Sequence, residues 1–487
     1  MKSSDRSERF ASDETSAYAT PGGEPGEGAP IIAAGAEAVA AGAEASDLAD
    51  AKAGATPAAA RDAHAAELER RIEAAAPRNF WALVAFSVVL RISWIFKTES
   101  VIMPAFLDLV SGSPIFRSLL PLLNRTGQSV VPALLADRLR GTAVKSRFFL
   151  QTTAAMGLSF CVLSAFAFVL DGKYPAWFPY VFLAIYFVFF SATGANLLAF
   201  GTVQGKLIPA AKRGRLMGAS GAAGSILAIA VAWFAIPALL DLPRHGFGWL
   251  FLIAGVGFLL AALASLFLVE PADEARNLRL SRKTFTELAD VFRDDVRFRR
   301  LAIVAMLLMC TQNIFPHYQF LGRDRLDAGG FSMMTWLVAQ NAGAGIFGSV
   351  FGWIADRSGN AWSLRLQGMI AVTTPWLGLA LANESVLGGD AYWVTFFLLG
   401  LTPVTLRTLT NYVLELCPRE QHPRYVGALS ISQAIPLLLS APIGMALEPL
   451  GFEAVFAFAS LLIGAGAVGA WFLSEPRAKT ELASVAE

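Results

Sequence analysis

The feature that most constrains this sequence is a succession of long apolar runs that begins at Phe80. A helix needs about 20 predominantly apolar residues to cross the hydrocarbon core of a bilayer, and twelve such runs follow one another. They cover residues 80–109, 114–136, 147–170, 177–205, 214–239, 248–269, 299–321, 331–355, 363–383, 391–416, 424–447 and 453–473. The longest connection, residues 270–298, follows the sixth run. The pattern therefore predicts an all-α membrane protein with two groups of six transmembrane helices.

The composition agrees with a membrane protein. Of the 487 residues, 55% are hydrophobic and 16% are charged, and the mean hydropathy is +0.53. A soluble domain carries about 25% charged residues. The net charge of +1 gives no indication of nucleic-acid binding. The three cysteines, Cys161, Cys310 and Cys417, lie in or beside apolar runs, and their odd number argues against a disulfide framework.

Sequence motifs of enzymes are absent. The chain contains no HExxH zinc motif, no phosphate-binding P-loop and no G-x-S-x-G nucleophile elbow. We therefore expect neither an enzyme nor the ATP-driven subunit of a pump. We also predict no cofactor and no bound metal.

The chain divides by composition into five parts. Residues 1–77 are rich in Ala, Glu, Gly, Asp and Ser and have no apolar signal-peptide core, so we expect a disordered cytoplasmic tail. A first six-helix bundle is predicted at 78–269, a linker at 270–298 and a second bundle at 299–475. Residues 476–487 are expected to form a second cytoplasmic tail.

Basic residues in the loops predict the orientation. Loops after even-numbered spans hold twelve Lys and Arg, and loops after odd-numbered spans hold four. Because Lys and Arg favour the cytoplasmic side, we expect the linker and both termini inside a multi-pass protein of the inner or plasma membrane. In the linker, Thr284 and Glu287 have the spacing of a capping box, and apolar residues at helical spacing follow. This predicts an amphipathic tether helix on the inner membrane surface.

Two landmarks recur in the two halves in the same order. The pair Asp137–Arg138, in the stretch 133–147, returns as Asp356–Arg357 in the stretch 351–365. A proline followed by an arginine six residues later, and by a glycine three residues after that, occurs after the fourth and again after the tenth span. The repeated order indicates a duplicated six-span unit.

With these landmarks the chain resembles the major facilitator superfamily over about residues 78–475. The hallmark loop of that family reads approximately G-x-x-x-D-R-x-G-R-R between spans two and three, with a degenerate copy between spans eight and nine. The second copy here matches at Gly352, Asp356, Arg357 and Gly359. The first matches at Asp137 and Arg138, whereas Ala133 and Arg140 replace the two glycines.

The resemblance implies a fold of two pseudo-symmetric six-helix bundles. It also implies a gating role for Asp137, Arg138, Gly352, Asp356 and Arg357, in which the Asp-Arg pairs latch the two halves together. The alternative for these residues is a charge at the membrane edge that only sets topology.

Polar residues inside the spans carry the functional prediction, because a charge that faces lipid is costly and therefore faces a cavity or a partner. Arg91 lies 11 residues past Phe80, or about 16 Å along the helix, near mid-membrane. In the family, spans 1, 4, 7 and 10 line the central pathway with help from spans 2, 5, 8 and 11. The predicted pathway residues are Arg91, Lys97, Glu99, Gln128, Asn196, Gln312, Asn313, Gln340, Asn341, Arg407 and Asn411.

Other roles for the same residues remain open. Pairs inside the membrane can also fix helix packing, and Arg407 and Glu415 lie on one helical face. Guanidinium groups near the midplane suit an anionic or a polyhydroxyl substrate. Ionisable groups inside the spans are candidates for proton coupling, and they are Glu99, Glu415 and His317.

The resemblance implies a secondary active transporter of a small organic solute that works by alternating access, with protons as the candidate coupling ion. Its expected partners are the substrate and the lipid bilayer, and we expect a monomer. The alternative is a transporter-like sensor or scaffold that binds a ligand without net transport. An enzyme acting on lipid-linked substrates would need a cluster of carboxylate or histidine side chains at a membrane face, and the sequence shows none.

Overall fold

The structure of this chain is a computed structural model. It describes residues 57–242, 245–272, 283–383, 389–418 and 421–476. The chain divides into two compact units, Met1–Glu69 and Arg70–Glu487, and the account below concerns the second unit. Of the predicted tail at 1–77, residues 1–56 lie outside the described residues, whereas residues 57–77 are helical and belong to α2 (Pro57–Ile95). Of the predicted tail at 476–487, residues 477–487 lie outside the described residues.

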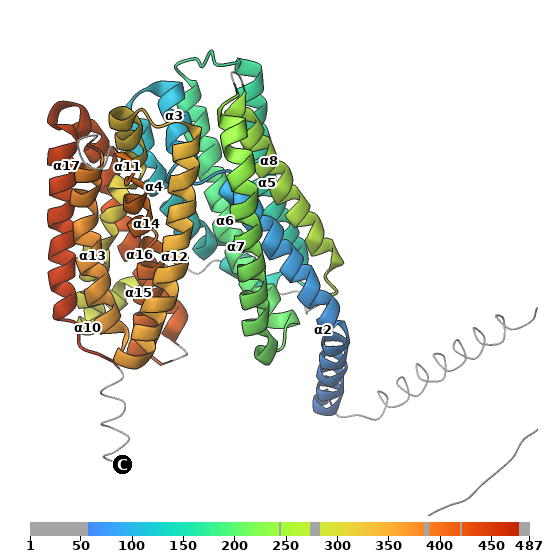
Figure 1. Cartoon of the computed structure of the whole chain (residues 1–487). Coiled ribbons are helices and arrows are strands. Elements are labelled where there is room, and N and C mark those ends of the chain that lie inside the picture. Colours follow the sequence, from blue (N-terminus) through green and yellow to red (C-terminus); the bar gives the residue numbers. More distant parts are fainter. Residues whose placement is uncertain (1–56, 243–244, 273–282, 384–388, 419–420, 477–487) are drawn as a thin grey trace, which may run out of the picture. The chain divides into compact units, whose positions relative to one another are not determined.

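Helices make up nearly all of the described chain, and no β-strand occurs among these residues (Figure 1). The helices of the first half are α2 (Pro57–Ile95), α3 (Ile102–Ser111), α4 (Pro114–Gly141), α5 (Lys145–Leu170), α6 (Phe178–Leu207), α7 (Ala210–Leu240) and α8 (Gly246–Ala264), followed by the 3₁₀ turn η1 (Ser265–Phe267). After α9 (Lys283–Asp294), the second half contains α10 (Val296–Met309), α11 (Thr311–Leu326), α12 (Gly330–Ser358), α13 (Asn360–Leu381), α14 (Trp393–Leu399), α15 (Thr402–Leu416), α16 (His422–Ala434), the 3₁₀ turn η4 (Ile435–Leu439) and α17 (Ser440–Trp471).

The membrane crossings are consistent with the twelve predicted spans. Nine segments of the described chain are long and apolar enough to cross a bilayer. One of them, Arg424–Trp471, has a non-helical residue at Gly451 with φ 76° and ψ 173°. At 48 residues it is about twice as long as one crossing requires, so it accounts for two. The helices α4 and α13, with 28 and 22 residues, are long enough to span but more polar.

Three spans that the sequence predicts as continuous are broken near their middle. The first is interrupted between Ile95, where α2 ends, and Ile102, where α3 begins. The seventh changes from α10 to α11 at Cys310, and the tenth changes from α14 to α15 after Gly400. Pro403, in the first turn of α15, has no N–H for the carbonyl one turn earlier, which favours that break. Each break leaves backbone groups at mid-membrane that need a polar neighbour.

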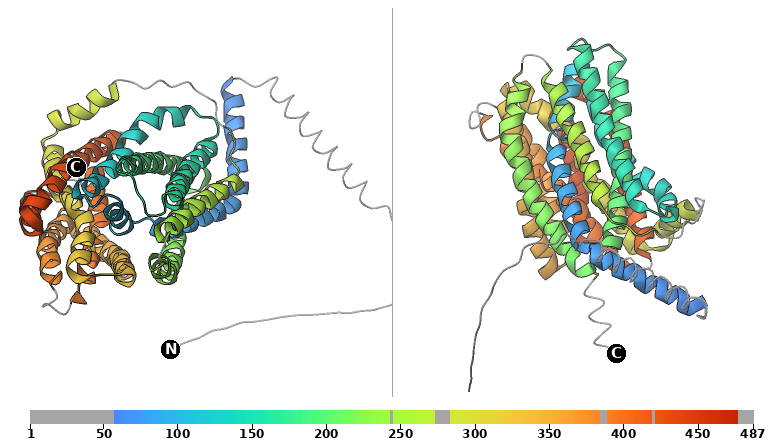
Figure 2. Two further views of the ribbon diagram at one scale, coloured as in Figure 1. Left: turned by 90° about the horizontal axis from the view of Figure 1, so that it is seen from above. Right: turned by 90° about the vertical axis from the view of Figure 1, so that its right-hand side faces the viewer.

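The two halves lie side by side. Seen along the bundle, helices coloured blue to green form one half and helices coloured yellow to red form the other (Figure 2). We call the end of the bundle where α5 begins and α12 ends the linker end, because α9 also lies there. The opposite end, where α7 ends and α12 begins, is called the far end.

The helix α9 is held by the second half. Asp295, directly after α9, caps the next helix by accepting the N–H groups of Arg297 and Phe298 at 2.8 and 3.1 Å. Its other carboxylate oxygen accepts the hydroxyl of Tyr425, the first turn of α16, at 2.9 Å. The capping-box residues Thr284 and Glu287 lie in α9, but their side chains fall outside the described part of the structure.

The internal repeat continues into a carboxylate that the sequence comparison of the halves did not include. Glu270, at the end of the first half, accepts the N–H groups of Lys145 and Ser146 at 3.0 and 2.6 Å, and so caps α5. In the second half Glu475 accepts the N–H of Ala361 at 3.0 Å and caps α13. A negative charge is favourable at a helix N-terminus, and both residues precede a proline. Each bundle is thus closed by the same contact between its last span and its third.

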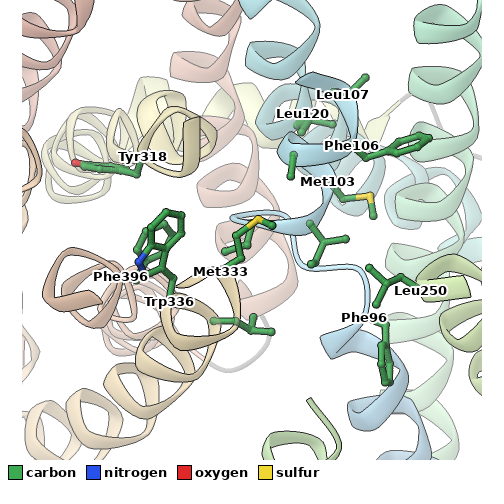
Figure 3. Close-up of a cluster of buried hydrophobic side chains, with 14 of the residues drawn as sticks. Phe96, Met103, Phe106, Leu107, Leu120, Leu250, Tyr318, Met333, Trp336 and Phe396 are labelled. Carbon is green, nitrogen blue, oxygen red and sulfur yellow. The ribbon is translucent and has the colours of Figure 1, made fainter. Parts of the chain in front are cut away.

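Apolar packing joins the halves at the far end. One continuous buried cluster includes Met103 and Leu107 of α3, Tyr318 of α11 and Met333 and Trp336 of α12 (Figure 3). The start of α12 also meets the end of α7, where the rings of Trp233 and Phe331 lie 6.1 Å apart. The two halves are therefore tied together at the far end by side chains from both.

The crossing of α5 and α8 generates a stability prediction. A Cβ on Gly255 would lie 2.7 Å from the backbone nitrogen of Cys161 and 2.9 Å from the carbonyl oxygen of Gly157. Because backbone cannot yield cheaply, Gly255→Val should lower the free energy of unfolding by about 1–3 kcal/mol, measured by thermal or chemical denaturation in detergent. The control Gly201→Val lies on α6 with no atom within 4 Å of its Cβ. Equal losses in both variants would contradict the close packing.

Candidate functional site

A cavity of about 360 Å³ lies between the two halves. Its volume falls at the lower end of the range for small-molecule sites. The first half contributes Arg91, Trp94, Thr98, Glu99, Ser100, Leu120, Pro121, Asn124, Arg125, Gln128 and Tyr186. The second half contributes Gln312, Phe315, Pro316, Gln340, Asn341, Ala344, Gly400, Thr402, Pro403, Leu406 and Arg407.

All three helix breaks contribute to this cavity. Between α2 and α3 the chain supplies Thr98, Glu99 and Ser100, and the hydroxyl of Ser100 donates to the amide oxygen of Gln340 on α12. The break between α14 and α15 supplies Gly400 and Thr402, and α11 supplies Gln312 two residues after its break. The segment between α2 and α3 is non-helical, and such backbone is tolerated at membrane depth where it lines a polar cavity. At the other two breaks Cys310, Gly400 and Leu401 keep right-handed helical angles, so the helices are kinked there and not unwound.

Three arginines surround the cavity, and two of them bind amides of the opposite half. Arg91 of α2 donates to the Asn341 side-chain oxygen on α12 at 3.0 Å. Arg125 of α4 donates to the Gln433 side-chain oxygen on α16. Arg407 of α15 lies close enough to Arg91 for their positive charges to oppose each other. The cavity is therefore crossed by two hydrogen bonds between the halves and contains concentrated positive charge.

The carboxylate at this cavity is paired locally. Glu99 forms an ion pair with Lys97, which is fully buried behind the cavity wall. The Lys97 ammonium also lies 3.2 Å from the ring centroid of Trp94 and 4.6 Å from that of Phe190. Such contacts stabilise a desolvated cation. Glu99 and Lys97 therefore neutralise each other within one turn of irregular backbone.

The cavity continues toward the linker end. A second hollow of about 290 Å³ shares Arg125, Leu406 and Arg407 with the first. It also contains Asn411, one turn closer than Arg407 to the linker end of α15, and Gln433 of α16, which accepts from Arg125. In the same direction α7 and α12 diverge from their contact at the far end (Figure 1). The backbones of α7 and α12 therefore separate toward the linker end, the end on which the second hollow lies.

The far end is sealed by a buried polar cluster. Arg117 of α4 is fully buried, forms an ion pair with Asp108 of α3, and donates from Nε to Nδ1 of His317 on α11 at 3.1 Å. Because a guanidinium can only donate, Nδ1 accepts, and the proton of the neutral imidazole is on Nε2. That nitrogen lies 3.1 Å from Oγ of Ser118. The cluster joins α4 of one half to α11 of the other.

Most of the predicted pathway residues line the main cavity or the second hollow next to it. The main cavity brings together Arg91, Glu99, Gln128, Gln312, Gln340, Asn341 and Arg407, and Asn411 lines the second hollow. Lys97 reaches the cavity only through its ion pair with Glu99.

Two of the predicted pathway residues occupy different positions. Asn196 of α6 donates to Thr152 and Thr153 of α5 at 3.2 and 2.6 Å, and so packs inside the first half. Asn313 is buried against η4, where it donates to the Pro436 carbonyl at 3.0 Å. Asn196 and Asn313 were predicted to line the pathway. In the structure the amide of each is used for packing between helices and does not face either hollow.

The proton-coupling candidates lie apart from one another. Glu99 lines the cavity, and His317 lies in the sealed cluster at the far end. Glu415 is half-buried near the linker end, where it accepts a hydrogen bond from Asn360 at 2.9 Å. Glu415 is therefore positioned to tie α15 to α13, and its partner in this packing role is Asn360 and not Arg407.

The gating candidates lie at the linker end. Gly352, Asp356 and Arg357 are exposed, and the Arg357 guanidinium lies 4.6 Å from the ring centroid of Trp353. Gly359, with φ 88°, makes the turn between α12 and α13. Asp137 and Arg138 lie in α4, but their side chains fall outside the described part of the structure.

Arg117 and Arg125 are two charged residues of the seal and the cavity that the predicted set omits. The signal for both was a charge inside an apolar run, since they lie 3 and 11 residues after Pro114. Arg117 could be taken for a charge at the end of a span, and only its burial between two halves reveals otherwise. The aromatic wall residues Trp94 and Tyr186 gave no signal, because aromatic residues are frequent throughout the spans.

Comparison with known proteins identifies the family. The model of the Major Facilitator Superfamily matches residues 126–411. The chain therefore belongs to this superfamily, and the protein is a multi-pass membrane transporter rather than an enzyme. A search of curated proteins found no match.

Solved structures of transporters share the fold at low sequence identity. The nucleoside transporter NupG is 12% identical, with a TM-score of 0.65 over 81% of this chain and 100% of NupG. A POT family transporter in complex with 5-aminolevulinic acid is 13% identical, with a TM-score of 0.61 over 80% and 95%. A D-xylose-proton symporter is 14% identical, with a TM-score of 0.61 over 82% and 98%. Likeness at this identity establishes the fold alone.

The sealed cluster generates the second prediction. Removing one partner of a buried ion pair leaves an uncompensated charge and costs about 3–5 kcal/mol. Arg117→Met and Asp108→Asn should each lower the free energy of unfolding, and the double variant should lose at least about 1 kcal/mol less than the sum. Denaturation of the purified protein measures all three. Arg300→Met, exposed on α10, is the control. Strictly additive losses would show that the pair does not contribute to the seal.

Proposed function

We propose that this protein is a secondary transporter that carries a small organic solute through the cavity by alternating access. The observation that carries the proposal is the position of the cavity. It lies between the two bundles, is sealed at the far end by the Arg117 cluster, and continues toward the linker end. A site that both halves line is exposed to opposite sides of the membrane when the halves rock about it.

The linker end faces the cytoplasm in this proposal. The excess of Lys and Arg in the loops of that end supports the orientation, and both termini are then cytoplasmic in a plasma or inner membrane. In this orientation a cavity that continues toward the linker end would belong to an inward-facing form. In the outward-facing form the linker end closes, and Asp356 and Arg357 at the end of α12 are candidates for the latch that holds it shut.

The far end offers a position for a direct test. A Cβ at Gly330, the first residue of α12, would lie 3.2 Å from Cβ of Leu240, the last residue of α7. This is close to the separation of about 3.5–4.5 Å found in disulfides. Leu240→Cys combined with Gly330→Cys, in a chain whose three native cysteines are replaced by serine, should therefore form a bond that keeps the far end closed.

We expect the oxidised double variant to lose flux in proteoliposomes and to regain it on reduction. The flux assay uses a panel of sugars, organic acids and drugs, with each single-cysteine variant as a matched control. Flux that continues at the unmodified rate while the bond is intact would contradict alternating access. Ligand binding without flux of any solute in the unmodified protein would favour the sensor.

We further propose that His317 couples transport to protons. Its Nδ1 accepts from Arg117, so protonation of Nδ1 would remove one of the two hydrogen bonds that this imidazole forms between α4 and α11. The charged groups around this contact are Arg117, its partner Asp108, Arg323 and Asp324. A proton arriving from outside would place a second positive charge against Arg117 and so weaken the contact that closes the far end. Glu99 and Glu415 are paired with Lys97 and Asn360, away from this contact.

Acidifying the outside should therefore accelerate uptake into proteoliposomes, and His317→Gln should abolish the acceleration. Glu415→Gln serves as the matched control and should keep it. The rate is measured as a function of an imposed pH gradient at zero membrane potential. Uptake that ignores the gradient in the unmodified protein would remove proton coupling, and a gradient response retained by His317→Gln would assign it to another group.

A further inference from the structure

The positive charge of the cavity has no negative counterpart within the described residues. Arg91 and Arg125 donate to the neutral amides of Asn341 and Gln433. No ion pair is recorded for either of them or for Arg407 within the described chain. Among the described residues that line the two hollows, Glu99 is the one carboxylate, and it is taken by Lys97.

Other acidic groups inside the bundle are also occupied. Asp108 is paired with Arg117 at the far end. Glu415 accepts from Asn360 near the linker end. Among the described residues, Asp108 and Glu99 are thus each paired with a cation, whereas the three cavity arginines have no carboxylate partner. Arg91 and Arg407 are exposed and Arg125 is half-buried, so their charges are open to the space between the halves. Ionisable residues within membrane spans face a cavity or a partner, and an anion from outside the chain can supply the missing negative charge.

We propose that the solute is a small organic anion with two or more negative charges, a phosphate ester or a polycarboxylate. This inference depends on the proposed transport function and specifies its substrate. Guanidinium groups bind carboxylate and phosphate oxygens with paired N–H donors. Three such groups around a cavity of about 360 Å³ provide more positive charge than a neutral sugar or a single carboxylate would require.

The arginines come from both halves, which links binding to the conformational change. Arg91 and Arg125 belong to the first half and Arg407 to the second. The charges of Arg91 and Arg407 oppose each other across the cavity. An anion bound between them removes this repulsion and bridges the halves. The anion thereby favours closure of the linker end around itself.

The test measures binding to the purified full-length protein in nanodiscs by calorimetry, in a buffer free of polyvalent anions. The probes are inorganic phosphate, glycerol 3-phosphate and citrate, with glycerol and glucose as neutral counterparts. We expect at least one anion to bind at least tenfold more tightly than both neutral solutes. Preference among the three probes distinguishes the phosphate ester from the polycarboxylate, and preference for inorganic phosphate would show that the organic part is not recognised.

Substitutions of the arginines test the assignment. Arg91→Gln, Arg125→Gln and Arg407→Gln should each weaken anion binding about tenfold or more, because each removes a charge-assisted contact. Arg300→Gln, exposed on α10 outside the cavity, should not change it. Arg407 has no recorded hydrogen bond to the rest of the described chain, so Arg407→Gln remains informative if another variant fails to fold.

Several results would overturn the proposal. They are tighter binding of the neutral solutes, no binding of the three anions at millimolar concentration, or undiminished anion binding in a folded Arg407→Gln variant. Flux in proteoliposomes separates this proposal from the proposed function. Flux of a neutral solute alone would support transport and overturn the anion site, whereas anion binding without any flux would support the site and contradict transport.

Discussion

The structure depends on one constraint, which is the cost of placing charge and unpaired backbone in hydrocarbon. The chain meets this constraint in two ways. At the far end Arg117 is paired with Asp108, and near the cavity Lys97 is paired with Glu99. In the cavity itself, Arg91 and Arg125 receive neutral partners and Arg407 faces the open space. The pair at the far end therefore lies where the halves are closed, the pair at the cavity wall neutralises its own charges, and the three arginines without a carboxylate partner line the open space.

The same constraint explains where the helices break. A break exposes N–H and C=O groups, and these are affordable only beside polar groups. The irregular segment between α2 and α3 supplies Thr98, Glu99 and Ser100 to the cavity, and the start of α15 supplies Thr402. The breaks thus turn apolar spans into a polar surface over a short length. Continuous helices could offer only one side chain per turn to the same space.

Much of the fold could be predicted from the sequence because hydropathy reports the bilayer directly. Local sequence patterns were enough to predict the two groups of six spans and to recognise the two Asp-Arg pairs as copies of each other. The sequence did not predict the carboxylates of Glu270 and Glu475 as a matched pair, since each caps a helix more than 100 residues away. Nor did the apolar pattern reveal the breaks, because a run of suitable length is equally apolar whether or not it is interrupted.

The candidate site was predicted in part, for a related reason. A polar residue in a span must face either a cavity or a partner, and the sequence alone does not separate the two. Arg91, Gln340 and Asn341 face the cavity. Asn196 satisfies the same requirement by donating to hydroxyls of the neighbouring helix. Whether Asn196 faces the cavity or a neighbouring helix is set by the rotation of α6 about its axis. That rotation depends on packing against α4 and α5, which the sequence position of one asparagine does not specify.

The proposed mechanism requires the two halves to change their contacts, and small residues in the middle and linker-side parts of α7 and α12 bear on this requirement. Gly218 and Gly221 of α7, and Gly345 and Gly348 of α12, have no atom within 4 Å of the position a Cβ would take. These two helices are in contact at the far end and diverge toward the linker end (Figure 1). Glycine lets helix backbones approach closely in membranes, so these faces can pack when the linker end closes. The far end is held by the Arg117 cluster and apolar side chains, whereas the glycine faces of α7 and α12 are uncovered toward the linker end. The proposed mechanism needs two sets of contacts of similar free energy, one that closes the far end and one that closes the linker end. The uncovered glycine faces are candidates for the second set.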